Sequence, residues 1–353
     1  MKRESGLYSQ IYDMNNIRLA FDNARKKKSH YTEVKIIRQN PDPYLQKIHD
    51  VLKNKNFRTS KYEIFNKIDH HKEREIFKLP FYPYRIVHHC ILQILAPIWK
   101  KIFIRDTYAS IKKRGIHDGA ERVKKALVDD ANTQYCLKLD IRKFYPSIRH
   151  NILKALIEYK IKDRDVLWLL FELIDSTDNI PGIKDGVPIG SVPSQYFGNI
   201  DLAYFDHWIK EVKKIHYYYR YCDDMVILHK SHTFLHNLLK EIGQYLTDEL
   251  KHDLNKNYQI FPVDARGIDF LGYRFFHRYI LVRKSIVDRF KTKVKEINES
   301  GKLTKSDISS LASYKGWFIH ANTHNLITKY LLPIYSKYGI KHKALHRFQS
   351  RAA

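Results

Sequence analysis

Cysteine is scarce in this chain, which has only three in 353 residues: Cys90, Cys136 and Cys222. No two of them have the Cys-x-x-Cys spacing of redox and zinc motifs. The sequence therefore indicates neither a disulfide framework nor a structural zinc site, and we expect the protein to work in a reducing compartment.

Long apolar runs are also lacking. The longest, at 91–99, is interrupted by Gln93 and Pro97 and is far too short to cross a bilayer. The amino-terminal sequence, MKRESGLYSQ, is polar and has no apolar signal-peptide core. We therefore expect a cytoplasmic protein that does not engage a membrane.

Acidic residues are outnumbered by basic ones. The chain has 63 Lys and Arg against 38 Asp and Glu, which gives a formal net charge of +25. Such an excess predicts a polyanionic partner, either nucleic acid or an acidic membrane surface, although a merely solvated basic surface would also account for it. The 25 Tyr and 18 Phe favour nucleic acid, because flat rings stack on bases and riboses.

The length and the 44% of hydrophobic residues allow a sizeable core divided among two or three units, and we expect packed lobes because no repeat or low-complexity linker occurs. Helical spacing of apolar residues recurs in seven segments, at 1–60, 83–103, 116–127, 148–157, 193–210, 233–250 and 280–353. Strand patterns occur at 62–79 as a pair, at 135–139, at 217–228 as a hairpin and at 267–276.

Three short loops carry residues that could serve a function, but each is unspecific by itself. His70 and His71 lie in the turn of the first strand pair, and without a third ligand nearby an exposed turn is favoured over a metal site. The basic turn at 112–115 and the glycine-bearing loop at 186–190 each precede a predicted helix, where phosphate oxygens or a nucleotide can approach the backbone. Ser191 or Ser194 is expected to cap the second of these helices.

The stretch YYYRYCDDMVILHK, at 217–230, is the strongest chemical signal in the chain. Two runs of aromatic and branched residues flank Asp223 and Asp224, which predicts a tight hairpin with two carboxylates at its tip. Strand propensity gives no reason to place two like charges side by side. A cation is therefore expected there, and a divalent metal is the first candidate.

A third carboxylate, Asp140, follows the predicted strand at 135–139. Three acids that converge with substrate phosphates suit Mg²⁺, and two such ions can clamp the attacking and leaving oxygens of a phosphoryl transfer. From spacing alone, pairing of these carboxylates with Arg142 or Arg220 accounts for them equally well.

Five motifs in order carry a resemblance to a known family: LDIRKFYPSI, PIGSVPSQYFGN, YRYCDDMVIL, LNKNYQI and IDFLGYRF. The set resembles the palm motifs of reverse transcriptases, and the likeness covers about residues 55–325. It implies an α+β right-hand polymerase, with an RRM-like palm of antiparallel sheet on helices, helical fingers and a short helical thumb. The implied divisions are an amino-terminal extension and fingers at 1–135, a palm at 136–280 and a basic helical thumb at 281–353.

The resemblance also implies a metal site. Asp140, the backbone carbonyl of Ile141 and Asp223 would bind two Mg²⁺ ions, for which Mn²⁺ could substitute, and Asp224 would support them. Lys256 falls near the lysine that protonates the leaving pyrophosphate in this family.

Nucleotide and primer contacts follow from the same resemblance. The implied nucleotide-binding residues are Lys72 and Arg74 in the fingers, Tyr145 as an aromatic gate against the ribose 2′-hydroxyl, and Ile189, Gly190 and Gln195 in the loop before the long helix. The implied primer grip is Phe270, Leu271, Gly272 and Tyr273.

The chain departs from the common family pattern in two places. Most reverse transcriptases carry Gln-Gly and Ser-Pro pairs where this chain has Ile189-Gly190 and Ser194-Gln195, a replacement similar to that of diversity-generating retroelement enzymes and related antiphage-defence enzymes. Because Ile189 removes a hydrogen-bond donor near the nucleotide, we expect looser base or sugar selection. Cys222, in the Tyr-x-Asp-Asp box, is interpreted as a small residue in a tight turn.

The expected function is that of an RNA-directed DNA polymerase of a bacterial or phage retroelement. Its partners would be a structured template or non-coding RNA, the cDNA duplex, dNTPs, and an accessory protein or second polymerase subunit. Either antiphage defence or mutagenic retrohoming would fit. The alternatives are an RNA-dependent RNA polymerase, against which Tyr145 argues, and a catalytically silent RNA-binding scaffold.

Overall fold

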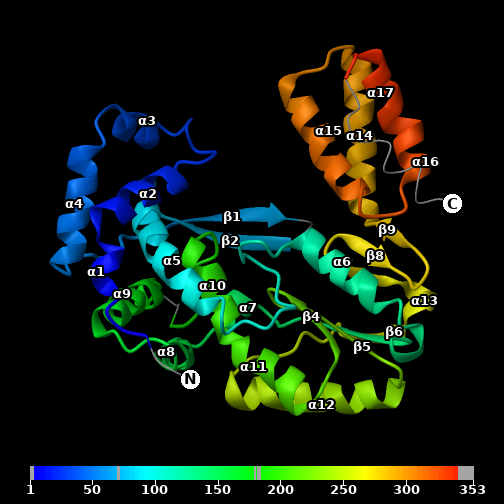
Figure 1. The fold of residues 1–353 in the computed structure, drawn as a ribbon, viewed down its shortest axis with the longest axis horizontal. Helices are drawn as coiled ribbons and strands as arrows, with labels where there is room; N and C mark the ends of the chain where they lie inside the picture. The colour runs from blue at the N-terminus through cyan, green and yellow to red at the C-terminus, as the bar shows by residue number, and fades with distance from the viewer. Residues whose placement is uncertain (1–3, 70–71, 179, 181–183, 341–353) are drawn as a thin grey trace. The chain divides into compact units, whose positions relative to one another are not determined.

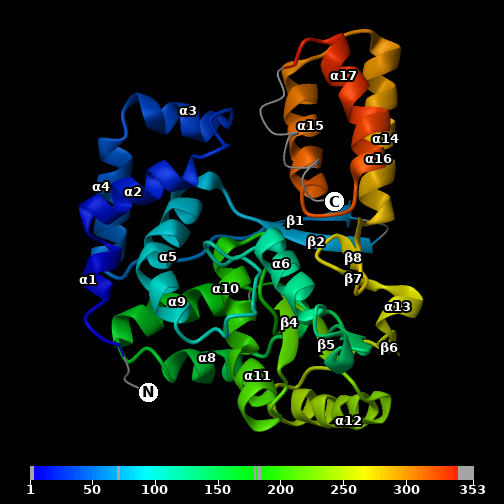
Figure 2. The same ribbon diagram turned by 45° about the vertical axis from the view of Figure 1, so that its right-hand side comes forward.

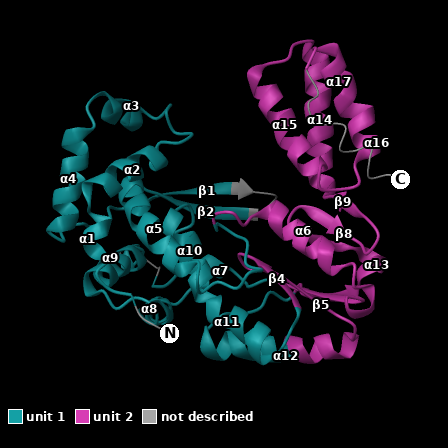
Figure 3. Cartoon of the chain, in the orientation of Figure 1, with its two compact units in different colours: residues 1–111, 140–216, 240–256 teal, residues 112–139, 217–239, 257–353 magenta. Residues whose placement is uncertain are grey.

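The computed structural model describes residues 4–69, 72–178, 180 and 184–340. The chain divides into two compact units, each assembled from separated segments (Figure 3). Unit 1 contains residues 1–111, 140–216 and 240–256, and unit 2 contains residues 112–139, 217–239 and 257–353. We describe each unit by itself.

The amino-terminal part of unit 1 is helical, as predicted. Its helices are α1 (Tyr8–Ile11), α2 (Met14–Ala24), α3 (Thr32–Gln39) and α4 (Asp42–Lys53). Asp13 begins α2 by accepting hydrogen bonds from the N–H groups of Asn15 and Asn16 with its carboxylate. The buried face of α2 packs on α5 (Ile86–Trp99), the buried helix predicted at 83–103, which follows the π-helical turn η1 (Phe81–Arg85).

A two-stranded antiparallel hairpin extends from unit 1 (Figure 1). It is formed by β1 (Glu63–Asp69) and β2 (Lys72–Lys78), which confirms the predicted strand pair. Its turn residues His70 and His71 lie outside the described residues. Because a two-stranded ribbon buries little of its surface, large apolar side chains such as Ile64 and Phe65 are exposed.

The rest of unit 1 consists of short helices. They are α7 (Phe144–Ser147), α8 (His150–Glu158), α9 (Arg164–Asp175), α10 (Val192–Asp201), α11 (Ala203–His207) and η3 (Trp208–Val212). The one long helix predicted at 193–210 is therefore wrong, because the chain breaks it into α10, α11 and η3. Ser191 takes the N-cap position of α10, but its side chain makes no capping hydrogen bond. Helix α12 (His232–Glu249) contributes to both units.

Unit 2 is built on a four-stranded sheet in the order β4-β5-β3-β6, in which every neighbouring pair is antiparallel. The strands are β3 (Tyr135–Leu139), β4 (Tyr217–Tyr221), β5 (Asp224–His229) and β6 (Gln259–Pro262). The middle residues of β4 and β5 are buried in succession, which explains why these strands are apolar or aromatic without alternation. Helix α6 (Ile116–Ala126) follows the basic turn at 112–115, as predicted, and is succeeded by η2 (Asp130–Asn132).

A second, three-stranded sheet follows α13 (Val263–Arg266) and corrects two predictions. It contains β7 (Ile268–Phe270), β8 (Tyr273–Phe275) and β9 (Ile280–Val282). The stretch 267–276 is a hairpin rather than one strand, because Leu271 and Gly272 both have positive φ and reverse the chain. The helical prediction from residue 280 onward is wrong at its start, because 280–282 pair with β8.

Helices complete unit 2: α14 (Lys284–Ser300), α15 (Lys305–Phe318), α16 (His324–Leu326), η4 (Ile327–Leu331) and α17 (Leu332–Lys337). In Figures 1 and 2 helices α14, α15 and α17 lie side by side, and their core includes Phe290 and Phe318, whose ring centroids are 4.8 Å apart. Lys293 lies 2.7 Å from a carboxylate oxygen of Asp307, and this hydrogen bond lowers the pKa of Asp307 to about 2. The predicted α+β class is confirmed. No helix within the described ranges is both long and apolar enough to span a membrane.

Thr304 begins α15 through a capping box. The Asp307 N–H donates to the Thr304 hydroxyl at 3.1 Å, and the Asp307 carboxylate accepts from the Thr304 N–H at 2.9 Å. We expect Thr304→Ala to lower the free energy of unfolding by about 1 kcal/mol, because it leaves a helix N–H unsatisfied. Thr292→Ala is the matched control: Thr292 is exposed within α14, where Ala has the higher helix propensity. Equal urea midpoints for the two variants would contradict the capping role.

Candidate active site

The β4–β5 hairpin carries two of the predicted metal ligands, Asp223 and Asp224. Tyr221 pairs with Asp224, so the two turn residues are Cys222 and Asp223, and Cys222 has a φ of 59°. The hairpin is confirmed, but Asp224 is the first residue of β5 and not part of the tip. The guanidinium of Arg220, which is fully buried, donates to the Cys222 carbonyl at 2.9 Å and so supports the turn from inside unit 2.

Lys138, on the central strand β3, lies beside Asp224. Its ammonium is 3.6 Å from a carboxylate oxygen of Asp224 and also donates a short hydrogen bond to the Asp269 carbonyl. The Asp269 carboxylate in turn accepts from Arg283 at 2.7 Å. This chain of contacts joins the β4–β5 hairpin to the β7–β8 hairpin within unit 2. The sequence predictions did not include Lys138, although a lysine within a buried strand, two residues before Asp140, is a signal that could have pointed to it.

Asp140 lies in unit 1, directly after the last residue of β3. Its backbone carbonyl accepts from the Asn255 N–H at 2.9 Å, and one of its carboxylate oxygens accepts from the Asn255 amide at 3.3 Å. Within the ranges that the structure describes, its carboxylate forms no ion pair with a lysine or arginine, and the exposed Arg142 side chain pairs with no acid. The alternative that Arg142 neutralises this acid is therefore wrong.

The backbone around Ile141 pairs with the segment 253–255. Ile141 and Leu254 form an isolated antiparallel bridge, whose two hydrogen bonds are Asn255 N–H to Asp140 carbonyl and Arg142 N–H to Asp253 carbonyl, each at 2.9 Å. These bonds flank Ile141 and do not use its own carbonyl. Asn255 belongs to the LNKNYQI motif, and sequence reasoning chose its neighbour Lys256, which is exposed.

Tyr145 is joined by main-chain hydrogen bonds to the glycine-bearing loop at 186–190. The Val187 N–H donates to the Tyr145 carbonyl at 3.0 Å, and the Gly186 N–H donates to the Ile148 carbonyl at 2.8 Å. Gly186 has a φ of 93°, and a Cβ at this position would lie 2.9 Å from the Pro146 backbone. The structure therefore brings the predicted gate and the predicted nucleotide loop together in unit 1.

The same loop adds to the edge of strand β2. The Phe77 N–H donates to the Ile189 carbonyl at 2.9 Å. A Cβ on Gly190 would lie 3.1 Å from the Phe77 carbonyl and 3.3 Å from the Ile76 side chain. Arg74, which is exposed, points to the same face of β2 as Ile76, two residues on.

Two further residues were predicted to bind the nucleotide, Gln195 and Lys72. Gln195 is exposed and accepts a hydrogen bond from the Ser110 hydroxyl at 2.7 Å with its amide oxygen. Lys72 is the first residue of β2 and pairs with Asp69, but its side chain is outside the described part of the structure. Their roles in nucleotide binding remain predictions.

The predicted primer grip, Phe270 to Tyr273, forms the turn of the β7–β8 hairpin in unit 2. All four residues are buried, and a Cβ on Gly272 would lie 2.4 Å from the Trp317 ring of α15, so only glycine fits there. The Tyr273 hydroxyl donates to the Trp317 carbonyl at 3.2 Å and lies 3.0 Å from Nδ1 of His117. The hairpin is thus held between α6 and α15.

A buried polar chain in unit 1 supports the segment that carries Tyr145. Ser147 lies 2.9 Å from Nδ1 of His252, and Nε2 of His252 lies 2.7 Å from a carboxylate oxygen of Asp201. The His252 and Asp201 side chains are completely buried. They connect α7 to α10, and sequence reasoning missed them because the three residues are far apart in the chain.

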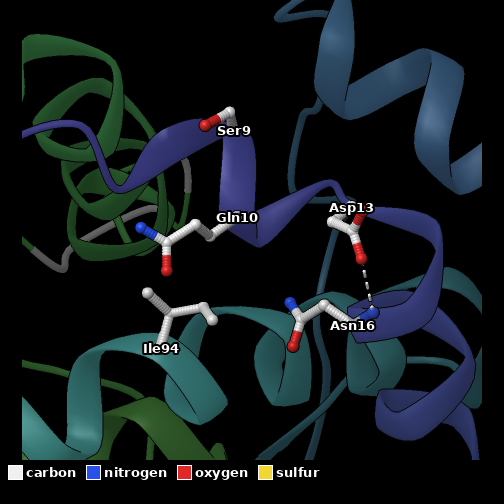
Figure 4. Close-up of a pocket in the computed structure, with 5 residues that line it drawn as sticks. All are labelled: Ser9, Gln10, Asp13, Asn16 and Ile94. Carbon is white, nitrogen blue, oxygen red and sulfur yellow. Dashed lines mark hydrogen bonds between the residues drawn. The ribbon is translucent and has the colours of Figure 1, made fainter.

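A surface pocket of unit 1 lies away from these residues. Its lining is Ser9, Gln10, Asp13, Asn16 and Ile94 (Figure 4). The Asp13 carboxylate caps α2, and the Asn16 amide donates to the carbonyls of Ile11 and Cys90. These polar groups serve the fold, and none belongs to the predicted site.

Comparison with known proteins gives one family and several relatives. The family model described as "Reverse transcriptase (RNA-dependent DNA polymerase)" matches residues 65–275, more than half of the chain. Protein YkfC of Escherichia coli (strain K12) is 25% identical over 232 residues, which cover 55% of this chain and 61% of that protein. A putative COX1/OXI3 intron 2 protein of Saccharomyces cerevisiae is 24% identical over 203 residues, covering 40% of this chain and 24% of that protein. The chain thus spans less than two thirds of either relative.

Solved telomerase structures share the fold. Apo telomerase from Candida tropicalis aligns with a TM-score of 0.50 at 14% identity, covering 83% of this chain and 58% of that chain. The same telomerase in complex with a fragment of telomeric RNA aligns with a TM-score of 0.51 at 12% identity, over 79% and 55%. The predicted right-hand polymerase fold is confirmed by these likenesses, which concern the fold alone.

The contact between α6 and α15 predicts a pH dependence. His117 and His320 stack with ring centroids 4.3 Å apart, and burial lowers the pKa of both rings. The folded protein therefore binds fewer protons than the unfolded chain as the pH falls below the ordinary histidine value of about 6.5. Stability is fully present above that value and is lost as the pH falls through the lowered pKa values.

We expect the melting temperature to fall between about pH 7 and about pH 5, and to fall less in His117→Gln than in the wild type. His324→Gln, which removes an exposed histidine of α16, should keep the wild-type slope. Thermal melts across this range provide the measurement, and an unchanged slope in His117→Gln would contradict the assignment.

Proposed function

The chain belongs to the reverse transcriptase family, and from this premise we propose that it is an RNA-directed DNA polymerase that copies an associated structured RNA into cDNA. The observation that carries the proposal is that the Asp140 carboxylate accepts from the neutral Asn255 amide and, among the residues that the structure describes, pairs with no lysine or arginine. A purely structural acid in a chain of net charge +25 would be expected to have a basic partner.

We propose that Asp140, Asp223 and the Ile141 carbonyl bind two Mg²⁺ ions, with Asp224 held by Lys138 as a supporting acid. The donor set fits, because carboxylate and carbonyl oxygens are the ligands that Mg²⁺ prefers, and Mn²⁺ accepts the same set. When bound, such ions neutralise the charge that develops on the attacking and leaving oxygens of nucleotidyl transfer.

The other roles in this proposal follow the parts of unit 1. Tyr145 excludes a ribose 2′-hydroxyl, while Lys72 and Arg74 hold the triphosphate and Lys256 supplies a proton to pyrophosphate. The support for the triphosphate role is the main-chain bond between β2 and the Ile189 carbonyl, which places Arg74 on a strand attached to the loop. Gly190 allows the loop to approach β2 closely, and Gln195 lies near the start of α10, the helix that follows the loop.

In unit 2 we propose that the turn at 270–273 contacts the primer through its backbone, since its side chains are buried. The helices from α14 onward would track the duplex through phosphate contacts as a thumb. In this scheme residues 1–135 form the fingers and their extension, 136–280 the palm and 281–353 the thumb. Antiphage defence and diversity-generating mutagenesis are both retained as cellular roles, with the cytoplasm as the place of action and an accessory protein as a partner.

Removing one catalytic charge tests the proposal. Asp140→Asn and Asp223→Asn keep the size of the side chain but weaken metal binding, so each should lower dNTP incorporation on an RNA template by about 100-fold or more. Asp253→Asn is the matched control, because Asp253 is exposed and only its backbone carbonyl is bonded near Asp140. Wild-type primer extension by Asp223→Asn would leave the RNA-binding scaffold as the better account.

Sugar selection separates DNA from RNA synthesis. We expect the wild type to prefer dNTPs and Tyr145→Ala to increase the relative use of ribonucleotides by about tenfold or more, because the ring no longer fills the space of the 2′-hydroxyl. Tyr145→Phe keeps the ring and should keep the preference. Single-nucleotide incorporation assays measure this ratio, and a wild type that uses both sugars equally would favour the RNA-dependent RNA polymerase alternative.

A further inference from the structure

A second group of potential metal ligands lies in unit 1, outside the proposed polymerase site. It consists of His150 at the start of α8, Asp175 at the end of α9 and Asp178 three residues later. One ligand atom from each lies within 4.8 Å of the others. Nδ1 of His150 is 3.2 Å from Oδ1 of Asp178 and 3.5 Å from Oδ1 of Asp175.

The orientation of His150 is the observation that points to a ligand. Its ring is buried, with 6% of the residue exposed, and Nε2 lies 2.7 Å from the Gly186 carbonyl. A carbonyl only accepts, so Nε2 carries a proton and Nδ1 is the ring atom that faces the two carboxylates. In the described part of the chain the hydrogen bonds of this ring all go through Nε2. A nitrogen that faces two carboxylates at these distances needs a positive charge between them, which either a metal ion or a proton on Nδ1 supplies.

The basic side chains near the cluster pair with Asp175 and Asp185 rather than with Asp178. The Lys154 ammonium lies 2.5 Å from Oδ1 and 2.7 Å from Oδ2 of Asp175 and neutralises that carboxylate. Arg149 is engaged by Asp185 at 2.6 Å. No lysine or arginine among the described residues pairs with Asp178, so no basic side chain other than His150 lies against this carboxylate.

We propose that His150, Asp175 and Asp178 bind one divalent transition-metal ion of the Zn²⁺ type, separate from the polymerase metal site. One imidazole nitrogen and two carboxylate oxygens are a ligand set that zinc takes in proteins, with its remaining position left to water. Mg²⁺ is a poor competitor here, because it prefers oxygen ligands alone.

The ion would fix the start of the loop that carries Ile189 and Gly190. The His150 ring bonds to the Gly186 carbonyl, and the His150 N–H donates to Asp185 at 3.1 Å. A metal ion that holds the His150 ring in place would therefore also hold Asp185 and Gly186, the first residues of the loop. The role is structural, and it stands whether or not the chain proves to be a polymerase.

Titration of metal-free, full-length protein with Zn²⁺ in a large excess of Mg²⁺ tests the site. Calorimetry should show one zinc equivalent in the wild type and an affinity lowered about tenfold or more in Asp178→Asn, which alters an exposed side chain. Glu158→Gln, an equal charge change at an exposed position of α8, should bind as the wild type does. Zinc should also raise the melting temperature of the wild type and Glu158→Gln more than that of Asp178→Asn.

Two results would overturn the proposal. If the wild type takes up no zinc, a proton on Nδ1 is the cation and the cluster is an ion-pair network. If the zinc equivalent persists in Asp178→Asn but is lost in Asp223→Asn, it occupies the polymerase carboxylates instead. Retention in Asp223→Asn together with loss in Asp178→Asn supports the separate site.

Discussion

The candidate site depends on one electrostatic constraint: in a chain with a formal net charge of +25, the candidate carboxylates have many lysines and arginines with which they could pair. Two of these carboxylates, Asp140 and Asp224, have different neighbours. Asp140 meets the neutral amide of Asn255, whereas Asp224 lies beside the Lys138 ammonium. That difference supports a ligand role for Asp140 and a supporting role for Asp224, because an ammonium already offsets the second charge.

Main-chain hydrogen bonds do most of the positioning around these acids. Asn255 is fixed to the Asp140 carbonyl, Val187 to Tyr145 and Phe77 to Ile189, so each candidate segment of unit 1 is located by its backbone. Glycines permit the closest approaches, at Gly186 against Pro146 and at Gly190 against Phe77.

Much of the fold could be predicted from the sequence, because long apolar periodicity and alternating strands depend on near neighbours. The amino-terminal helices, the β1–β2 pair and the β4–β5 hairpin were of this kind. The errors came from pairing between distant segments. Ile280–Val282 form a strand only because β8 lies beside them, and the Trp317 ring leaves room for glycine alone at position 272 of the β7–β8 turn. No local pattern records either contact.

The residues of the candidate site also fall into those that local sequence motifs indicate and those that depend on distant contacts. Ordered motifs singled out Asp140, Asp223 and Tyr145 as candidates, whereas Asn255 and the Ser147–His252–Asp201 chain make contacts across more than 50 residues of sequence and were missed. The position of Asp224 within β5 also required the strand register, since one residue of slip would have placed it in the turn.

The central proposal is that Asp140 and Asp223 are both ligands of the same pair of metal ions. The most direct measurement is electron paramagnetic resonance of Mn²⁺ bound to the protein with an RNA template, a DNA primer and a non-reactive dNTP analogue. The account predicts a spin-coupled pair of ions about 4 Å apart that disappears when either aspartate is replaced by Asn. Spectra of isolated, uncoupled Mn²⁺ in the wild-type complex would contradict it.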